Sequence, residues 1–290
     1  MHRLNFTLAC LAFTASCWAQ VPTGARPDTP PPLPEDLELI ANIQYSQYPE
    51  TVLDIVRPKA ASREKRPGVL VIHGGGWTGG TKEQRLHPVA VRWARKGFVA
   101  ANVEYRLAKS APAPAAVTDV LNAARWFRRN AGKYNVAANR IVVTGDSAGG
   151  HLSLMVGMTP KSADLGPTVR VAAVINFYGI TDVADQLDGP NMRKYAVTWL
   201  PEQPGRFDLA RRVSPMTYVR KDVPAILTIH GDADQTVPYE HGVQLTRAVR
   251  EAGGDAEMIS VPQGAHGFPL EKVDELYEHI WAFLKVRRIM

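Results

Sequence analysis

Cysteine is nearly absent from this sequence, and this excludes cysteine chemistry from the mature chain. Only two cysteines occur among the 290 residues, Cys10 and Cys17. Both lie in a segment that starts with a short basic stretch and continues as an apolar run. This pattern resembles a secretory signal peptide over residues 1–19, cleaved after Ala19. A chain cut there has neither a disulfide nor a thiol nucleophile.

Long hydrophobic runs are also missing. The apolar stretch from Phe6 to Ala15 is too short to cross a bilayer, so we expect no stable membrane span. We expect export instead, to the medium or the periplasm. Residues 14–17 also resemble a lipoprotein box, but Thr14 stands where a branched aliphatic residue is usual. Lipoprotein anchoring is therefore the weaker expectation.

Neither sign of charge dominates strongly. The chain has 34 Lys and Arg residues against 28 Asp and Glu residues, a formal net charge of +6, and these residues are scattered. No cluster has the footprint of a nucleic-acid site, so we expect no nucleic-acid partner. The hydrophobic content of 45% is enough for a sizeable core, and the length suits one large α/β domain.

The chain divides into a proline-rich tether, residues 20–36, and one folded domain, residues 37–290. Prolines recur through the tether and cannot continue a helix or a sheet ladder, so this segment should be extended. The domain opens with strand-forming residues at 37–45 and 51–56 around a short connection. That pattern is typical of an antiparallel hairpin at a sheet edge.

Apolar strands then alternate with amphipathic helices. The expected strands cover residues 68–73, 98–105, 140–144, 171–177, 225–230 and 256–261, and helical spacing recurs around residues 86–94, 117–127, 152–156, 245–252 and 273–284. Such alternation predicts an α/β fold, with a mostly parallel sheet covered by helices on both faces. Residues 180–224 break the alternation. Their length and weak periodicity predict a lid-like insertion above the sheet.

The most informative motif is a serine flanked by glycines. An apolar strand ends at Gly145, and Ser147 and Gly149 complete a G-x-S-x-G pattern that opens the next helix. Small neighbours allow a turn sharp enough to present a serine hydroxyl at the end of a strand. The alternative is a glycine-rich turn that contains a serine by chance, so further residues must decide.

A serine nucleophile needs a base and an orienting acid. His266 follows the last expected strand in a flexible loop, whereas most of the other histidines lie in or near expected helices. Between the serine and His266, the segment from His230 contains two candidate acids, Asp232 and Asp234. Loops at the carboxyl ends of parallel strands converge, so a serine, acid and histidine in this order can meet. A metal site is the rival interpretation of the two aspartates, but no further ligands cluster near them, so we expect no metal.

A glycine loop follows the strand that begins near Gly68. In the sequence from His73 to Trp77, three glycines allow backbone N–H groups to approach a substrate oxygen. Together with the amide of Ala148 they can form an oxyanion hole. A phosphate-binding loop is the alternative, but Lys and Ser or Thr do not follow at the required spacing. We expect His73 to brace the loop and Trp77 to contact the substrate.

Together these motifs resemble the α/β-hydrolase serine esterases of the hormone-sensitive-lipase type, especially the bacterial esterase and feruloyl-esterase-like branch. The resemblance spans most of residues 37–286. It rests on the segments His73–Trp77, Tyr105–Leu107, Gly145–Gly150, His230–Pro238 and Gly264–Gly267. It implies the α/β-hydrolase fold, Ser147 as nucleophile, His266 as base, and the amides of Gly75, Gly76 and Ala148 as the oxyanion hole. It also implies Asp234 rather than Asp232 as the acid. In the family the acid is the fifth residue of the segment that opens with the histidine of the His-Gly pair, which is His230 in this sequence.

The sequence therefore predicts an exported serine carboxylic ester hydrolase that needs no cofactor and acts on a small-molecule ester. The polar residues of the insertion, such as Asp185, Arg193 and Lys194, favour short acyl groups because they offer a long chain little apolar surface. An amide hydrolase, formamidase-like or peptidase-like, would use the same triad. A binding protein on a hydrolase fold is a third alternative. The motifs specify neither the natural ester nor the oligomeric state.

Overall fold

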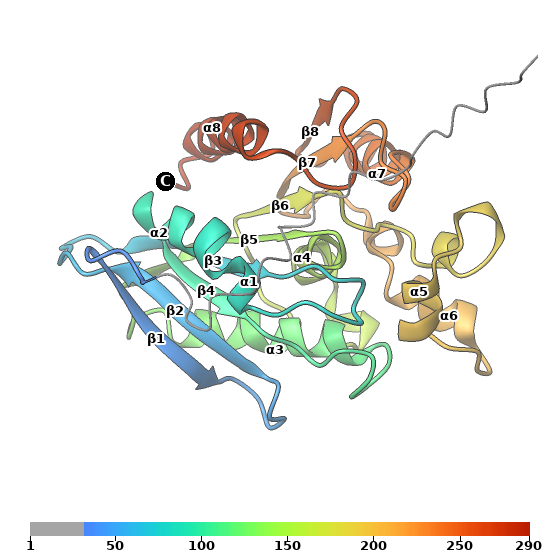
Figure 1. The fold of residues 1–290 in the computed structure, drawn as a ribbon, viewed down its shortest axis with the longest axis horizontal. Coiled ribbons are helices and arrows are strands. Elements are labelled where there is room, and N and C mark those ends of the chain that lie inside the picture. Colours follow the sequence, from blue (N-terminus) through green and yellow to red (C-terminus); the bar gives the residue numbers. More distant parts are fainter. Residues whose placement is uncertain (1–31) are drawn as a thin grey trace, which may run out of the picture. The chain divides into compact units, whose positions relative to one another are not determined.

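One twisted sheet forms the centre of the domain. The computed structural model describes residues 32–290, so the expected signal segment, residues 1–19, and residues 20–31 of the expected tether lie outside the described part of the chain. The sheet has eight strands in the order β1-β2-β4-β3-β5-β6-β7-β8 (Figure 1). They are β1 (Leu37–Gln44), β2 (Val52–Pro58), β3 (Arg66–Ile72), β4 (Val99–Val103), β5 (Val136–Asp146), β6 (Ala173–Phe177), β7 (Ala225–Gly231) and β8 (Ala256–Val261).

The pairing of the strands confirms the expected fold class. Strands β3 to β8 are mutually parallel, whereas β1 pairs with β2, and β2 with β4, in antiparallel fashion. The antiparallel hairpin therefore forms one edge of a mostly parallel sheet, which is the α/β-hydrolase arrangement. Within residues 32–290, no helix combines the length and the apolar character that a membrane crossing requires.

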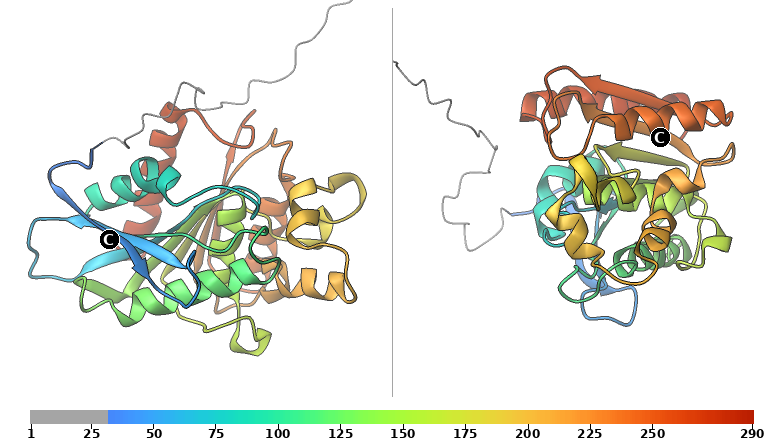
Figure 2. Two further views of the ribbon diagram at one scale, coloured as in Figure 1. Left: turned by 60° about the horizontal axis from the view of Figure 1, so that its bottom comes forward. Right: turned by 90° about the vertical axis from the view of Figure 1, so that its right-hand side faces the viewer.

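Helices cover both faces of the sheet, as Figures 1 and 2 show. One face carries α1 (Glu83–Arg85), the π-helical turn η1 (Leu86–Val91), α2 (Arg92–Arg95) and α8 (Leu270–Val286). The opposite face carries α3 (Ala115–Arg129), α4 (Ala148–Met158) and α7 (Glu240–Glu251). A short 3₁₀ turn, η2 (Lys161–Ala163), follows α4.

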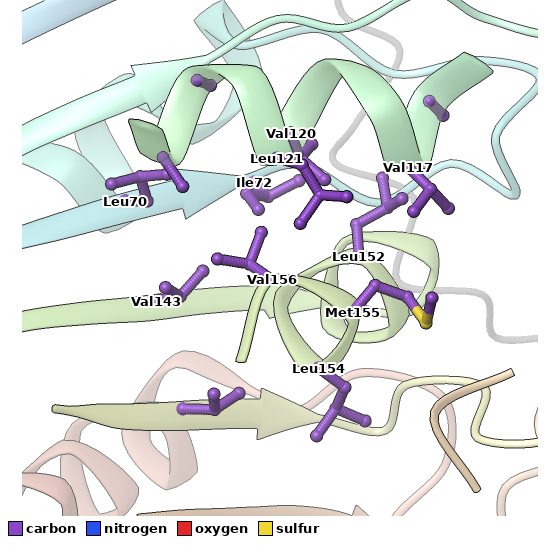
Figure 3. Close-up of a cluster of buried hydrophobic side chains, with 14 of the residues drawn as sticks. Leu70, Ile72, Val117, Val120, Leu121, Val143, Leu152, Leu154, Met155 and Val156 are labelled. Carbon is purple, nitrogen blue, oxygen red and sulfur yellow. The ribbon is translucent and has the colours of Figure 1, made fainter. Parts of the chain in front are cut away.

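The core lies on both sides of the sheet because each parallel strand is buried on both faces. In β3, Leu70 and Ile72 pack with the helices α3 and α4, whereas Val69 and Val71 pack with the helices on the opposite face. Figure 3 shows the first of these clusters, in which side chains of α3 and α4 meet those of the strands. The continuous apolar runs of the sequence follow from this two-sided burial.

The helical run after β3 is less regular than its sequence pattern predicts. A regular helix was expected around residues 86–94, but Leu86–Val91 form a π-helical turn between two short α-helical pieces. Pro88 lies inside this turn. It has no N–H to donate to the preceding turn, and its ring crowds the carbonyl there, so the regular α-helical ladder is interrupted.

The residues between β6 and β7 form an irregular segment near the carboxyl ends of the parallel strands (Figure 1). It contains α5 (Lys194–Trp199), α6 (Arg206–Arg212) and the 3₁₀ turns η3 (Ala184–Gln186), η4 (Gly189–Asn191) and η5 (Pro215–Tyr218). Trp199 anchors it: its ring is fully buried and stacks on Trp77 at 4.2 Å between ring centroids. The Trp199 carbonyl also accepts the N–H of Ala113 at 2.8 Å.

Replacing this anchor should destabilise the domain. We expect Trp199→Ala to lower the free energy of unfolding by about 3–5 kcal/mol, because it empties a site where a large ring is completely buried. Chemical denaturation of the variant and the unchanged protein measures this difference. Phe207→Ala, in α6 of the same segment, is the matched control: its side chain is 43% exposed, so the loss should be much smaller. Equal losses in the two variants would contradict the anchoring role.

Candidate active site

Ser147 stands at a sharp turn between β5 and α4. Its backbone has φ 54° and ψ −121°, a strained conformation for any residue with a side chain. The flanking glycines are needed for this turn: a Cβ at Gly145 would lie 2.4 Å from the carbonyl oxygen of Gly149, and a Cβ at Gly149 would lie 2.1 Å from that of Ile72. The Ser147 N–H donates to the Phe177 carbonyl at 2.9 Å. The turn therefore presents Ser147 at the carboxyl edge of the sheet.

Asp234 and His266 are brought together at the same edge. Asp234 follows β7 and His266 follows β8, and the Nδ1–H of His266 donates to Oδ2 of Asp234 at 2.7 Å. The other oxygen, Oδ1, accepts the backbone N–H groups of Thr236 at 2.7 Å and Val237 at 3.0 Å. Since one ring nitrogen donates to a carboxylate, the Nε2 of a neutral His266 is left free to accept a proton.

The Asp234 carboxylate is held in its charged form. Burial by itself raises its pKa, but hydrogen bonds from His230 and His266, together with the Val237 amide, outweigh burial and hold the pKa well below the ordinary value. Asp232 is different, since its side chain is exposed and its Oδ1 accepts the N–H of Gln263 at 2.6 Å. Of the two candidate acids, only Asp234 reaches the histidine.

The glycine loop after β3 folds back on itself. The Gly75 carbonyl accepts the N–H groups of Thr78 at 3.1 Å and Gly79 at 3.0 Å. Gly75 has φ +118° and Gly76 has φ +58°, and a Cβ at Gly75 would lie 2.2 Å from the Gly79 carbonyl oxygen. Only glycine fits there without displacing the backbone. Ala148, the third expected oxyanion residue, begins α4 directly after Ser147.

His73 supports this loop, as expected. Its ring is fully buried and stacks on Tyr105 at 4.3 Å between centroids. Its Nδ1 contacts the Gly74 carbonyl oxygen at 2.8 Å, and its Nε2 contacts Oε1 of Glu104 at 2.9 Å. These contacts fix the start of the glycine loop and leave the His73 ring without access to solvent.

The expected substrate contact of Trp77 is wrong for its side chain, which is completely buried. Besides stacking on Trp199, the Trp77 indole N–H donates to Nδ1 of His151 at 3.1 Å. Burial lowers the pKa of His151 to about 4, so its ring is neutral at pH 7 and can accept this bond. The Nε2–H of His151 then donates to the Val213 carbonyl at 2.7 Å. Trp77 therefore joins the glycine loop to the segment between β6 and β7.

Tyr195 is a site residue that the motifs did not reveal. A Cβ at Gly76 would lie 2.8 Å from the Cβ of Tyr195, so this α5 residue lies directly against the glycine loop. Its hydroxyl donates to Oε1 of Gln186 at 2.8 Å, and burial raises its pKa to about 12. In the sequence, Tyr195 is one of several aromatic residues in a segment without periodicity. Only the packing of that segment distinguishes it.

The segment that carries Tyr195 is also fastened to the loop that carries Asp234. Arg193 donates to the carbonyls of Gln235 at 2.9 Å and Thr236 at 3.0 Å, and Gln186 donates to the Thr236 carbonyl at 3.3 Å. These hydrogen bonds lie one and two residues after Asp234. The segment therefore bridges the glycine loop and the acid loop.

Tyr178 is a second residue that the motifs did not reveal. It follows β6 with φ 39°, a strained value for an aromatic residue, and its N–H donates to the Ile229 carbonyl at 2.8 Å. Its ring lies 4.6 Å from the His266 ring between centroids. Tyr178 therefore packs directly against the histidine of the site.

Within residues 32–290, no group of three His, Cys, Asp or Glu side chains lies close enough together to hold a metal ion.

Comparison with known proteins agrees with this architecture. The model of the BD-FAE family matches residues 53–249, which is more than half of the chain. The chain belongs to the BD-FAE family. Esterase LipC of Mycobacterium tuberculosis is 30% identical over 245 residues, which cover 79% of this chain and 59% of LipC. The chain thus spans little more than half the length of this curated relative.

Solved structures with the same fold include esterases of other sources. A truncated carbohydrate esterase from gut microbiota superposes with a TM-score of 0.74 at 28% identity, over 86% of this chain and 96% of that one. Thermogutta terrifontis esterase 2, phosphonylated by sarin, also gives a TM-score of 0.74, at 25% identity, over 89% of this chain and 97% of that one. The resemblance inferred from the motifs is confirmed at the level of family and fold.

Proposed function

We propose that the protein is an exported serine carboxylic ester hydrolase that acts on short-acyl esters through Ser147, Asp234 and His266. The observation that carries the proposal is the 2.7 Å hydrogen bond between His266 and Asp234, formed at the edge of the sheet where the strained turn presents Ser147. A base oriented by a charged acid, at the same edge of the sheet as a serine held in a strained turn, is the arrangement that acyl transfer requires. Export rests on residues 1–19, outside the described part of the chain.

The proposed reaction follows from these positions. The Nε2 of neutral His266 accepts the Ser147 proton as the serine oxygen attacks the ester carbonyl, and Asp234 stabilises the resulting imidazolium. The amides of Gly75, Gly76 and Ala148 donate to the oxygen that becomes negative. His266 then returns the proton to the leaving alcohol, which leaves an acyl group on Ser147. A water molecule, deprotonated by His266, releases the acid and restores the serine.

Two similar proteins support the proposed ester hydrolysis. LipC is named an esterase, and Thermogutta terrifontis esterase 2 is phosphonylated by sarin. A phosphonylating reagent reacts with an activated nucleophile much as an ester does, so such a nucleophile on this fold favours acyl transfer. Since the chain covers only part of the length of LipC, the activity of the whole protein remains our proposal.

The first test is the loss of the proposed nucleophile. Ser147→Ala should abolish ester hydrolysis and covalent labelling by a fluorophosphonate, because no other group in the site is placed to form the acyl-enzyme. Labelling detected by intact-protein mass spectrometry, with nitrophenyl acetate turnover alongside, measures both effects. Circular dichroism verifies that the variant is folded. A label that persists in folded Ser147→Ala would refute the assignment.

The second test separates the two candidate acids. Asp234→Asn should lower kcat by about 10⁴-fold, since the amide would favour the wrong imidazole tautomer and would not stabilise its cation. Asp232→Asn is the matched control, because its exposed side chain contacts the Gln263 amide and not His266. It should retain most of the activity. If Asp232→Asn caused the larger loss, the acid would have to be reassigned.

The third test concerns acyl length. Tyr195 lies against Gly76, so its ring limits the space beside the oxyanion amides, and acetyl to butyryl esters should be preferred over chains of about ten carbons or more. Tyr195→Ala should extend the preferred chain, with a gain in kcat/KM of up to about fourfold for each additional methylene that becomes buried. A nitrophenyl ester series below micellar concentrations measures this change.

Tyr195→Phe is the control for the acyl-length test. It removes the hydroxyl bonded to Gln186 but keeps the ring, so the chain-length preference should stay that of the unchanged protein. A maximum at long acyl chains in the unchanged protein would mean that residues 180–224 form a lipase lid. The proposed short-acyl preference would then be wrong.

A further inference from the structure

A cavity of about 300 Å³ adjoins the candidate site on the face of the sheet that carries α8. Its walls come from the ends of β3, β5 and β6, from the helical run after β3, from the loop after His266 and from the start of α8. Ser147, Asp234 and His266 do not line it, but Asp146 and Gly267, each adjacent in sequence to one of them, do. The cavity is therefore next to the reacting groups and separate from them.

The cavity lies on the side of His266. Gly267 and Phe268 follow the histidine and form part of the wall, and the Tyr178 ring contacts the His266 ring and also faces the cavity. Gly267 has φ +117°, and nothing lies within 4 Å of where its Cβ would be, so no side chain or backbone crowds the chain directly after the histidine. In the proposed reaction His266 protonates the leaving alcohol, so that alcohol must lie on the histidine's side of the site.

Tyr195 bounds the site beside the glycine loop. Tyr195 lies against Gly76 there and is fixed through Gln186 to the loop of Asp234. An ester bound at Ser147 therefore has little space beside Tyr195 and a cavity beyond His266. The acyl group fits the first position, and the alcohol fits the second.

The lining of the cavity is mostly aromatic and aliphatic. Phe177, Tyr178, Phe268 and Tyr277 contribute rings, and aliphatic side chains fill most of the rest. Offset or edge-to-face contacts with such rings favour an aromatic guest over an aliphatic one of the same size. A volume of about 300 Å³ is at the small end of the range for ligand sites and suits a single ring.

The charged residues of the cavity neutralise each other. Arg85 donates to both carboxylate oxygens of Asp146, at 2.7 and 2.6 Å. Burial of Asp146 by itself raises its pKa, but the Arg85 guanidinium outweighs burial and lowers it, so the pair stays ionised. A cavity whose only ion pair is internally balanced favours neither an anion nor a cation. A sugar would also bring more hydroxyl groups than these few polar atoms can satisfy.

We propose that this cavity is the subsite for the leaving alcohol and that it takes an uncharged alcohol with one aromatic ring. The preferred substrates are then short-acyl esters of arylmethanols. This inference rests on the proposed function, because it needs Ser147 and His266 in their roles. It adds the chemical class of the alcohol, which neither the motifs nor the family determines.

The test compares acetate esters whose alcohols have similar intrinsic reactivity. Benzyl acetate should be hydrolysed with a kcat/KM at least about tenfold above that of methyl acetate, because only the benzyl group fills the cavity. The kcat/KM for benzyl acetate should also exceed that for cyclohexylmethyl acetate, an ester of similar size, by about two- to tenfold, because only the benzyl ring can make contacts between aromatic rings. Benzyl acetate no better than methyl acetate would overturn the proposal.

Two cavity-filling variants locate the effect. Val273→Phe at the start of α8 and Val89→Phe in η1 each place a ring in the cavity without altering the catalytic groups. Each should lower kcat/KM for benzyl acetate by about tenfold and leave that for methyl acetate within about twofold. Val243→Phe, on α7 and 37% exposed, is the matched control and should change neither. Equal losses for both esters, or no loss for benzyl acetate, would refute the subsite.

Failure of this inference is distinguishable from failure of the proposed function. If a fluorophosphonate labels Ser147 and methyl acetate is hydrolysed, but benzyl acetate is not favoured, only the alcohol subsite is wrong. If neither labelling nor hydrolysis of any acetate ester occurs, the proposed function is wrong and the subsite falls with it. The comparison of substrates on the unchanged protein decides the matter even if a variant does not fold.

Discussion

The close approach of two backbone turns at the edge of the sheet is the constraint on which the site depends. A Cβ at Gly74 would lie 2.7 Å from the Asp146 carbonyl oxygen, and Cβ atoms at Gly145 and Gly149 would lie 2.5 and 2.1 Å from the Ile72 carbonyl oxygen. The glycine loop and the serine turn can therefore touch only because these positions lack side chains. This contact brings the proposed nucleophile next to the proposed oxyanion amides.

The same edge is closed on one side by the segment between β6 and β7. Trp199 stacks on Trp77 of the glycine loop, and Arg193 donates to the carbonyls that follow Asp234. The segment thus ties together two loops that contribute different parts of the site. This explains why Trp77 is buried as a structural contact, and why Tyr195 is the residue that faces Gly76. Because this segment is held at both loops, it bounds the site on this side.

The opposite side is organised around charge. Asp146 stands between Gly145 and Ser147, and its bidentate pair with Arg85 fastens the serine turn to the helical run after β3. Removing one partner would leave the other charge partly buried and uncompensated, which is costly. Beyond this pair, Tyr178 and Phe268 continue the aromatic wall toward His266. The two sides of the site therefore differ in the room they leave for a substrate group and in the side chains that line them. This difference is the basis for placing the acyl group on one side and the alcohol on the other.

The sequence by itself determined the fold class, the order of the strands along the chain and the candidate serine, acid and histidine. Apolar runs mark strands buried on both faces, and G-x-S-x-G marks a turn that only small residues permit, so both signals are local. Spacing alone left Asp232 and Asp234 open, and the resemblance to a family favoured Asp234. Only the tertiary structure decided that Asp234 reaches His266, that Trp77 is buried, and that Tyr195 and Tyr178 flank the site. Those contacts join residues 32 to 122 positions apart, and such long-range packing leaves no periodic pattern in the sequence.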